Sequence, residues 1–519
     1  MSISKAYTAQ ISGLNIEIIT IEVDISNGLH SFSVVGLGDR SVEESKDRIS
    51  SAIKHSGYAS PKQKNQKVVI SLAPADIRKE GPSFDLGMAM AYLKSAGDID
   101  FEPENILFLG ELSLEGTVRK VHGLLPILTQ ASKYGFTTAF IPKENANEAS
   151  LAKNIIVYAV SSLSEVIKHI SRDVRIEPIK YYNLFDLHDA SKGIGAQKED
   201  RAESEHDISH VRGNESAKRA LEIAAAGYHN IILYGPPGTG KTMLAKGLAT
   251  IMPKLSYEQS IEVTSIHSVA KVLEQDLITD PPFRSPHHTA SSISILGGGN
   301  NIKPGEISLA HRGILYLDEF PEFDKSVIEG LRQPLEDREI TVSRAKGSVT
   351  FPAQCLFVAS MNPCRCGKER GRGCVCSAHN IDQYRKRVSA SILDRIDLWV
   401  NVNEINYSKL GAITNEGEKS SQMRLRISKA RKLQESRFSK NGNVEKYFNS
   451  EMSAHDIETM AKLKDEARSI LMSFSERLRL SGRSFHRVIR VARTIADLDD
   501  SIFIEKNHVM EALQYRQRI

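Results

Sequence analysis

Apolar positions in the first part of the chain follow the two periods that distinguish strands from helices. Alternating or β-branched runs predict strands at residues 14–23, 31–35, 67–72 and 137–141. Helical spacing at 41–56 and 85–95 predicts helices between them. We therefore expect a mixed α/β domain over residues 1–170.

A polar stretch separates this domain from the rest of the chain. Residues 187–205 contain few large apolar side chains, which favours an interdomain linker, placed at 171–206. A long surface loop within one domain is the less favoured alternative, because structureless loops of that length are uncommon.

The pattern after the linker predicts a second α/β block and then a helical region. We place the α/β block at 207–405. It begins with helical spacing at 215–226, a buried strand at 230–234 and a glycine-rich turn. Residues 406–519 are charged and helical in pattern, with the best helices at 454–474, 485–498 and 506–515. The fold class is an α/β multidomain chain with a C-terminal helical domain.

Composition and charge limit the function only weakly. Lys and Arg number 68 against 64 Asp and Glu, a net charge of +4, so any nucleic-acid surface must be local. One Trp and 6% aromatic residues argue against a single-strand binder that stacks many bases. The chain contains no apolar run of membrane-spanning length and no secretory signal pattern, so we expect a cytoplasmic protein that does not enter membranes.

The strongest chemical signal is a glycine-rich loop between the strand at 230–234 and helical residues 243–249. It fits G-x-x-x-x-G-K-[ST] and comprises Gly235, Pro236, Pro237, Gly238, Thr239, Gly240, Lys241 and Thr242. Backbone N–H groups of such a loop converge on phosphate oxygens, Lys241 neutralises phosphate charge and Thr242 ligates Mg²⁺. The strand and helix on either side disfavour a chance turn, so the loop predicts ATP and Mg²⁺ as cofactors.

Two further strands end in polar side chains suited to the same chemistry. The strand at 314–317 precedes Asp318, which can hold Mg²⁺ through water, and Glu319, which can polarise the attacking water. Two solvated acids are the alternative, which the upstream glycine-rich loop makes less favoured. The strand at 355–361 ends at Asn362, whose amide can orient that water.

Two arginines are candidates for stabilising transition-state charge. Arg395 lies between Asp394 and Asp397, and alone such an arginine more often forms a local ion pair. The alternative is an arginine that reaches into a neighbouring subunit's ATP site. Arg483 opens a late helix and can contact the nucleotide from a lid.

These residues together resemble the AAA+ ATPases, and longer runs narrow the resemblance. Residues 282–299, 303–320, 331–345 and 360–367 resemble the magnesium-chelatase-like AAA+ family, in particular its ComM/YifB type. The resemblance extends over essentially the whole chain. One departure is Gly213 followed by Asn214, where the family usually has Gly-Gln; it lies outside the phosphate chemistry.

The resemblance implies a role for each site residue. Lys241 and Thr242 correspond to Walker A, Asp318 and Glu319 to Walker B, Asn362 to sensor 1, Arg395 to the trans-acting arginine finger, and Arg483 to sensor 2. It also implies an insert at about 282–304 and a hairpin before sensor 1 at about 339–351. Arg344 and Lys346 lie near the tip of that hairpin and are candidates for contacting DNA phosphates. The alternative is an ordinary surface hairpin kept soluble by its charges.

The function implied by the resemblance is an ATP-driven homo-hexameric DNA helicase. Such a motor would act on single-stranded or branched DNA and promote branch migration, so that DNA is integrated by homologous recombination in natural transformation, in contact with other recombination proteins. Two alternatives are the ATPase motor subunit of a magnesium chelatase and an ATP-dependent Lon-like protease.

The N-terminal domain resembles the protease domain of Lon (a ribosomal-protein-S5 domain 2-like fold) but lacks its dyad. Residues 79–83 resemble the segment with the serine nucleophile, and residues 121–126 the segment with the catalytic lysine. Leu125 stands in place of that lysine and cannot accept the proton of a serine. We therefore expect assembly or partner binding here and not proteolysis.

Four of the five cysteines crowd into one short stretch: Cys364, Cys366, Cys374 and Cys376. Four thiolates can bind Zn²⁺ tetrahedrally, although C-x-C pairs are less usual than C-x2-C, and His379 can substitute for one ligand. Zinc binding and redox-sensitive free thiols both remain open from the sequence. Residues 364–387 also carry a local basic excess, which makes them a second candidate for contacting DNA.

Overall fold

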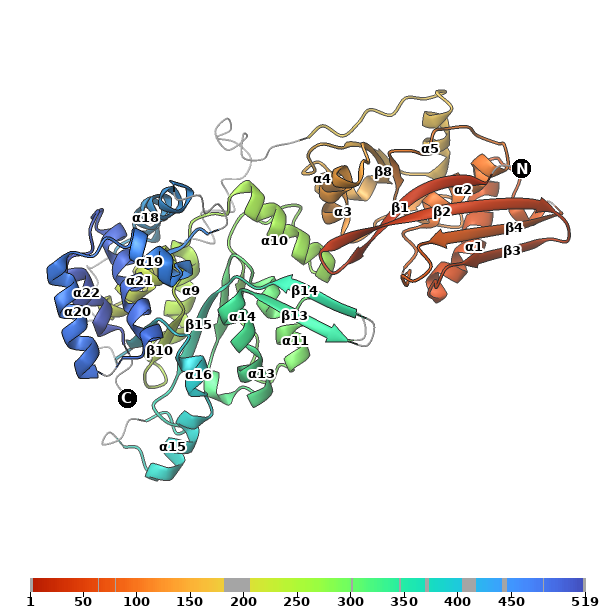
Figure 1. Ribbon diagram of the computed structural model, residues 1–519. Coiled ribbons are helices and arrows are strands. Elements are labelled where there is room, and N and C mark those ends of the chain that lie inside the picture. The colour runs from red at the N-terminus through yellow and green to blue at the C-terminus, as the bar shows by residue number, and fades with distance from the viewer. Residues whose placement is uncertain are drawn as a thin grey trace. The chain divides into compact units, whose positions relative to one another are not determined.

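Two units account for the residues that the computed structural model describes, namely 3–63, 65–79, 81–181, 206–299, 302–344, 347–368, 373–403, 417–440, 446–478 and 480–516 (Figure 1). Unit 1 holds the described residues of Met1–Ala190 together with Ser260–Ile278. Unit 2 holds those of Ser191–Gln259 and Thr279–Ile519. The polar stretch at 187–205 lies outside the described residues.

A seven-stranded mixed sheet forms the centre of unit 1, in the order β3-β4-β2-β1-β5-β8-β9. Its strands are β1 (Ser4–Ser12), β2 (Asn15–Asn27), β3 (Ser31–Val35), β4 (Gln66–Ala73), β5 (Ile106–Phe108), β8 (Thr138–Pro142) and β9 (Ile156–Val160). β1, β2 and β4 pair antiparallel, and the remaining neighbours pair parallel. On β2, Ile19, Ile21 and Val23 alternate into the core, as the period of the sequence predicts.

The helices of unit 1 bury their apolar residues in two hydrophobic clusters. They are α1 (Arg40–His55), α2 (Asp85–Ser95), α3 (Leu124–Ala131), α4 (Ala146–Ala149) and α5 (Leu163–Ile170). A small hairpin of β6 (Glu111–Leu112) and β7 (Val118–Arg119) completes the unit. Asp39 caps α1 by accepting the N–H of Val42, which explains why the helix begins there.

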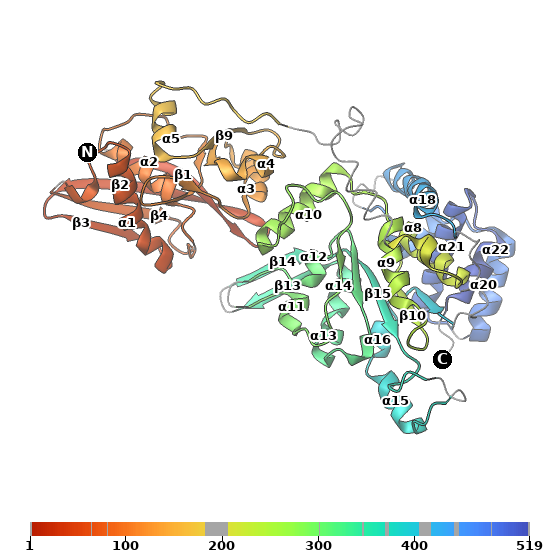
Figure 2. The ribbon, with the colours of Figure 1, turned by 180° about the vertical axis from the view of Figure 1, so that it is seen from behind.

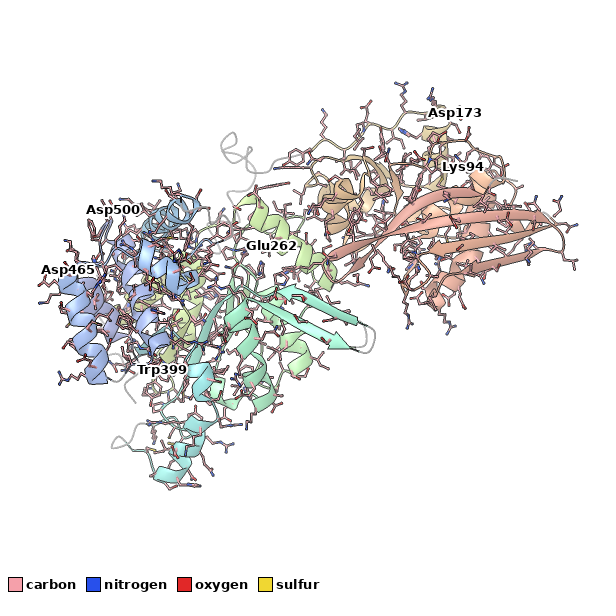
Figure 3. All side chains as sticks on the ribbon, viewed as in Figure 1. Lys94, Asp173, Glu262, Trp399, Asp465 and Asp500 are labelled. Carbon is pink, nitrogen blue, oxygen red and sulfur yellow. The ribbon has the colours of Figure 1, made fainter. Side chains whose placement is uncertain are left out.

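A segment from the second half of the sequence belongs to unit 1. The division between the units falls within the sequence of helix α10 (Tyr257–Ala270), which carries Glu262 (Figure 3), so that residues 260–278 are part of unit 1. Ser268 Oγ donates a 2.8 Å hydrogen bond to Glu148 and accepts one of 3.0 Å from the N–H of Gly123. Leu277 joins the core cluster around α3. Unit 1 is therefore completed by a piece of chain that begins and ends in the sequence of unit 2.

Unit 2 contains a five-stranded parallel sheet in the order β11-β12-β15-β10-β16. Its strands are β10 (Ile231–Tyr234), β11 (Phe283–Arg284), β12 (Ile314–Leu317), β15 (Leu356–Met361) and β16 (Leu398–Asn401). Helices α8 (Glu215–Gly227) and α9 (Lys241–Ile251) pack against each other beside it (Figure 2). Because all strands are parallel, their carboxyl ends share one edge, where ligands bind in open α/β sheets.

The segment predicted as a hairpin at 339–351 forms β13 (Glu339–Arg344) and β14 (Gly347–Pro352), which pair antiparallel. In both ribbon views this hairpin extends away from the rest of unit 2 (Figures 1 and 2). The connections between the strands contain short helices: α11 (Ser292–Leu296), α12 (Glu306–Leu309), α13 (Lys325–Gly330), α14 (Arg332–Asp337), α15 (Ala378–Lys386) and α16 (Ala390–Leu393).

Five C-terminal helices share one continuous core with the parallel sheet. They are α18 (Ser420–Lys440), α19 (Ala454–Met460), α20 (Asp465–Leu478), α21 (Gly482–Leu498) and α22 (Lys506–Gln514). The single helix predicted at 454–474 is wrong, because Lys462 has a φ of +51° and Leu463 forms a β-bridge with Ile504, which separates α19 from α20. Within the described ranges, every helix is too short or too polar to cross a membrane.

The buried carboxylate of Glu148 provides a test of how residues 260–278 are attached to unit 1. Its oxygens accept hydrogen bonds from Ser268 Oγ, the N–H of Leu125 (3.1 Å) and Asn145 Nδ2 (3.0 Å). Glu148→Ala leaves these donors unpaired and should cost about 2 kcal/mol locally. We expect hydrogen exchange of α3 and α10 amides in the full chain to accelerate about 30-fold.

The matched control is Glu144→Ala, which removes an exposed glutamate from the same segment and should leave exchange unchanged. Equal exchange in the two variants would show that Glu148 does not fasten α10.

Candidate functional site

The glycine-rich loop leaves β10 in a conformation that its glycines make possible. A Cβ on Gly235 would lie 2.2 Å from the carbonyl oxygen of Val402, so a larger residue does not fit. Gly238 and Gly240 have φ values of +77° and +87°, in the left-handed region that favours glycine. Gly240 directly precedes α9, and the backbone N–H groups at this helix start are therefore available to phosphate oxygens.

Lys241 is held inside the loop by three acceptors. Its Nζ donates to the carbonyl oxygens of Gly235 (2.8 Å) and Pro236 (2.7 Å) and to Oδ1 of Asn362 (3.0 Å). Burial lowers the pKa of Lys241, and the negative charges of Asp318 and Glu319 oppose that shift. A bound polyphosphate would favour the protonated amine further, because it brings more negative charge to the same place.

Thr242 and Asp318 form an oxygen-rich pair beside the lysine. Thr242 Oγ1 donates a 3.2 Å hydrogen bond to Asp318 Oδ2, and Ser360 Oγ donates to Asp318 Oδ1. The Tyr316 hydroxyl lies 3.4 Å from Thr242 Oγ1. A hydroxyl and a carboxylate are ligands that Mg²⁺ prefers, so these residues fit the ion that the loop sequence implies.

Glu319 follows Asp318 in an unusual backbone conformation. Its φ is +51°, and its N–H donates to Ser360 Oγ at 2.9 Å. Left-handed backbone is uncommon for a residue with a side chain, and such conformations persist where the surrounding structure fixes them. Ser360, on β15, therefore orients both acidic residues at the end of β12, a role that the sequence pattern did not reveal.

Three parallel strands thus bring the predicted phosphate-site residues to one edge of the sheet. β10 leads to the loop with Lys241 and Thr242, β12 to Asp318 and Glu319, and β15 to Asn362. The direct contact between Lys241 and Asn362 joins the first and third of these strand ends.

The two candidate arginines lie together on one carboxylate. Arg395 pairs with Oε2 of Glu336, and Arg483 donates to Oε1 of Glu336 at 2.6 Å. The hydrogen bond from Arg395, together with the charges of both arginines, lowers the pKa of Glu336. Glu336 was not among the predicted site residues, because nothing in its local sequence distinguishes it from other surface acids.

Asp394 and Asp397, the acids beside Arg395 in sequence, have other partners. Asp394 pairs with Arg487 at 2.9 Å, and Asp397 with His229 at 3.0 Å. The local ion pair that the sequence left open therefore exists, but its acid is Glu336.

The arginine pair lies at the opposite end of β10 from the glycine-rich loop. Asn230, the residue before β10, donates a 3.1 Å hydrogen bond to the carbonyl oxygen of Arg395, whereas Gly235 follows the strand. Four strand residues span about 13 Å. A cavity of about 880 Å³ at this end is lined by Asn230, Arg395 and Arg483, and the glycine-rich loop, Asp318 and Glu319 do not line it.

The other predicted contacts are only partly described. Arg344 ends β13, and Lys346 lies outside the described residues. Exposed hydroxyls pair across the hairpin, Thr341 with Thr350 at 3.1 Å and Ser343 with Ser348 at 3.0 Å.

The structure describes the four clustered cysteines and Leu125, the residue predicted to replace a catalytic lysine. Cys364, Cys366, Cys374 and Cys376 place their sulfur atoms within 4.8 Å of one another. His379 is not part of this group, and its ring contacts Gln383. Leu125 is fully buried in the core around α3, so it supplies no base there.

Comparisons with known proteins agree over the whole chain. Residues 21–145, 207–410 and 417–516 match family profiles described as "Subunit ChlI of Mg-chelatase", "Magnesium chelatase, subunit ChlI" and "Magnesium chelatase, subunit ChlI C-terminal". The chain is 37% identical to "Competence protein ComM" of Haemophilus influenzae, covering 100% of this chain and 98% of that protein. It is also 37% identical to the protein YifB of Escherichia coli, covering 99% and 97%. The "Magnesium-chelatase 38 kDa subunit" of Rhodobacter capsulatus is 28% identical over 30% of this chain and 50% of that protein.

Lys241→Ala tests the phosphate site directly. The change removes the cation that the loop carbonyls and Asn362 hold, and we expect ATP hydrolysis to fall at least about 100-fold. Nucleotide binding can be followed through the single tryptophan, Trp399 on β16 (Figure 3), because its ring lies 5.8 Å from that of Tyr234, the residue before the loop.

Lys246→Ala is the matched control, since Lys246 is exposed on the same helix, and it should hydrolyse ATP normally. Undiminished turnover in Lys241→Ala would exclude this loop as the hydrolytic site.

Proposed function

The chain belongs to the magnesium-chelatase-like AAA+ family that includes ComM and YifB, and from that premise we propose that it is an ATP-driven motor that acts on DNA as a homo-hexameric ring. The motor would drive branch migration and so promote the integration of DNA by homologous recombination during natural transformation. Full-length similarity to a competence protein supports the recombination role.

One observation carries the ring architecture. Arg395 and Arg483 share Glu336 at the amino end of β10, while Lys241 follows the carboxyl end of the same strand. The span of the strand puts the arginines beyond reach of the phosphates bound by their own chain. We assign both arginines to the ATP site of a neighbouring copy, where they stabilise the charge of the transferring phosphoryl group.

Within one chain, each remaining residue has a task in hydrolysis. Lys241 exchanges its loop carbonyls for phosphate oxygens and neutralises their charge. Thr242 and Asp318 would hold Mg²⁺, which would supply positive charge to stabilise the phosphates. Glu319 accepts a proton from the attacking water, and Asn362, fixed by Lys241, orients that water.

The hairpin of β13 and β14 is our candidate for gripping DNA. Its exposed face carries the hydroxyl pairs Thr341–Thr350 and Ser343–Ser348, which can bind phosphate oxygens without reading sequence. Arg344 and Lys346, near the turn, add positive charge in the sequence. Loss of the γ-phosphate at a subunit boundary would then shift the hairpins and move the bound strand.

We assign unit 1 to a Lon-like fold that has lost its dyad and serves assembly or contact with other recombination proteins. The buried position of Leu125, where a protease needs a lysine, supports this assignment.

A chelatase motor subunit is the second candidate, because the family profiles carry that description and a chelatase subunit aligns with part of the chain. Stimulation of ATP hydrolysis by DNA distinguishes the two functions, since the ATP hydrolysis of a chelatase motor is not expected to increase when DNA is added.

The experiment is a branch-migration assay on a synthetic four-way DNA junction with purified full chain. We expect ATP-dependent strand exchange, and none with Lys241→Ala. Removing the two hairpin charges together (Arg344→Ala with Lys346→Ala) should reduce DNA binding and lower the log–log salt slope by about 1.5, because each lost phosphate contact contributes about 0.7 to 0.9.

The control for the hairpin variant is Lys432→Ala with Lys440→Ala, which removes two exposed charges from α18. Basal ATP hydrolysis should be the same in both double variants. Equal DNA affinity of the two double variants would place the DNA contact elsewhere. A native chain that neither binds the four-way junction nor exchanges its strands would contradict the DNA motor.

A further inference from the structure

The four clustered cysteines converge on a single point. Cys364 Sγ lies 2.8 Å from the sulfur of Cys366, 3.4 Å from that of Cys374 and 3.9 Å from that of Cys376. The sulfurs of Cys366 and Cys374 are 3.5 Å apart. In a zinc tetrathiolate with Zn–S bonds of about 2.3 Å, the sulfurs stand about 3.8 Å apart. The separations of 3.4 to 3.9 Å lie close to the edge of that tetrahedron, and the 2.8 Å pair is shorter than the edge.

This arrangement bears on the two alternatives that the sequence left open, zinc binding and redox-sensitive free thiols. Two disulfides would require the sulfurs to form two separate pairs. Instead Cys364 approaches all three other sulfurs and not a single partner, which favours a shared ligand over pairwise oxidation. A single group of four cysteine sulfurs matches a closed structural metal site, in which the protein supplies every ligand.

The backbone after the first cysteine forms a tight turn. The N–H of Gly367 donates to the carbonyl oxygen of Cys364 at 2.9 Å, and Gly367 has a φ of +81°. The turn also brings the carbonyl oxygen of Lys368 to 3.4 Å from the sulfur of Cys364. The turn therefore holds the sulfurs of Cys364 and Cys366 close enough to ligate the same ion.

The cluster lies directly against the phosphate site. Cys364 is two residues beyond Asn362, and a Cβ added to Gly367 would approach Pro237 of the glycine-rich loop to 2.8 Å. On the far side of the cluster, α15 places the buried hydroxyl of Tyr384 against the backbone of Asn362. Gly367, within the sequence of the cluster, therefore lies beside the glycine-rich loop, and Tyr384, after the cluster, lies beside Asn362.

We propose that Cys364, Cys366, Cys374 and Cys376 bind one Zn²⁺ and that this ion fixes the turn at Gly367 against the glycine-rich loop. Crosslinking residues 364 and 376 through the metal restricts a segment that carries few large apolar side chains of its own. Zinc binding itself is independent of the DNA motor, whereas the coupling to the loop rests on that loop being the nucleotide site.

Metal analysis of the purified full chain tests the site. We expect about one zinc per native chain and less than about 0.2 in Cys366→Ser with Cys374→Ser. The matched control is Cys355→Ala, which removes the cysteine outside the cluster and should retain zinc. Metal-free native protein, or zinc retained in the double variant, would overturn the proposal; iron in place of zinc would overturn the choice of metal.

A second measurement does not depend on the variant folding. An organomercurial titrated into native full chain in the presence of a zinc-sensitive dye should release zinc as four thiols react. Release of no zinc would contradict the site.

A separate measurement tests whether zinc binding stabilises the glycine-rich loop. Removing zinc from the native chain should accelerate hydrogen exchange of the amides of residues 238–242 about tenfold, whereas strand β2 of unit 1 should be unaffected. Unchanged exchange in the loop would overturn the coupling, and this measurement is independent of whether the chain moves DNA.

Discussion

The proposed chemistry depends on one hydrogen-bonded contact between two strand ends. Lys241, after β10, reaches Asn362, after β15, and the parallel sheet leaves these ends side by side. The contact is possible because burial and the carbonyls of Gly235 and Pro236 hold the ammonium group inside the loop. A phosphate group that replaces those carbonyls therefore alters the environment of Asn362 at the same time. Phosphate binding and the positioning of the attacking water are therefore linked through the side chain of Lys241.

The opposite edge of the same sheet carries the complementary half of the proposed site. Glu336 keeps Arg395 and Arg483 together, and its single negative charge offsets one of their two positive charges beside one cavity. An ion pair of this kind, partly exposed, is easily exchanged for another anion. A neighbour's triphosphate could therefore take over both arginines from Glu336 without leaving a buried charge unpaired. The length of strand β10, about 13 Å, separates the groups that bind ATP from the groups that would complete the reaction.

Local motifs were predictable from the sequence, and long-range contacts were not. The glycine-rich loop, with Lys241, and the alternating strands of unit 1 depend on neighbouring residues, so their pattern is visible in the chain itself. Glu336 gains its importance from residues far away in sequence, and Lys462 breaks a helix because Leu463 pairs with a distant strand segment. The docking of residues 260–278 in unit 1 likewise rests on contacts that no periodicity records.

The sharing of one ATP site between two copies is the central claim, and mixing two inactive variants tests it most directly. Glu319→Gln removes the proton acceptor of its own site but keeps Arg395, whereas Arg395→Ala keeps the acceptor but lacks the arginine. At equal mixing, about a quarter of the boundaries in a ring would combine an intact acceptor with an intact arginine. We predict that ATP hydrolysis rises toward about a quarter of the native rate and is greatest at equal proportions. A mixture that stays as inactive as its components at every ratio would contradict the account.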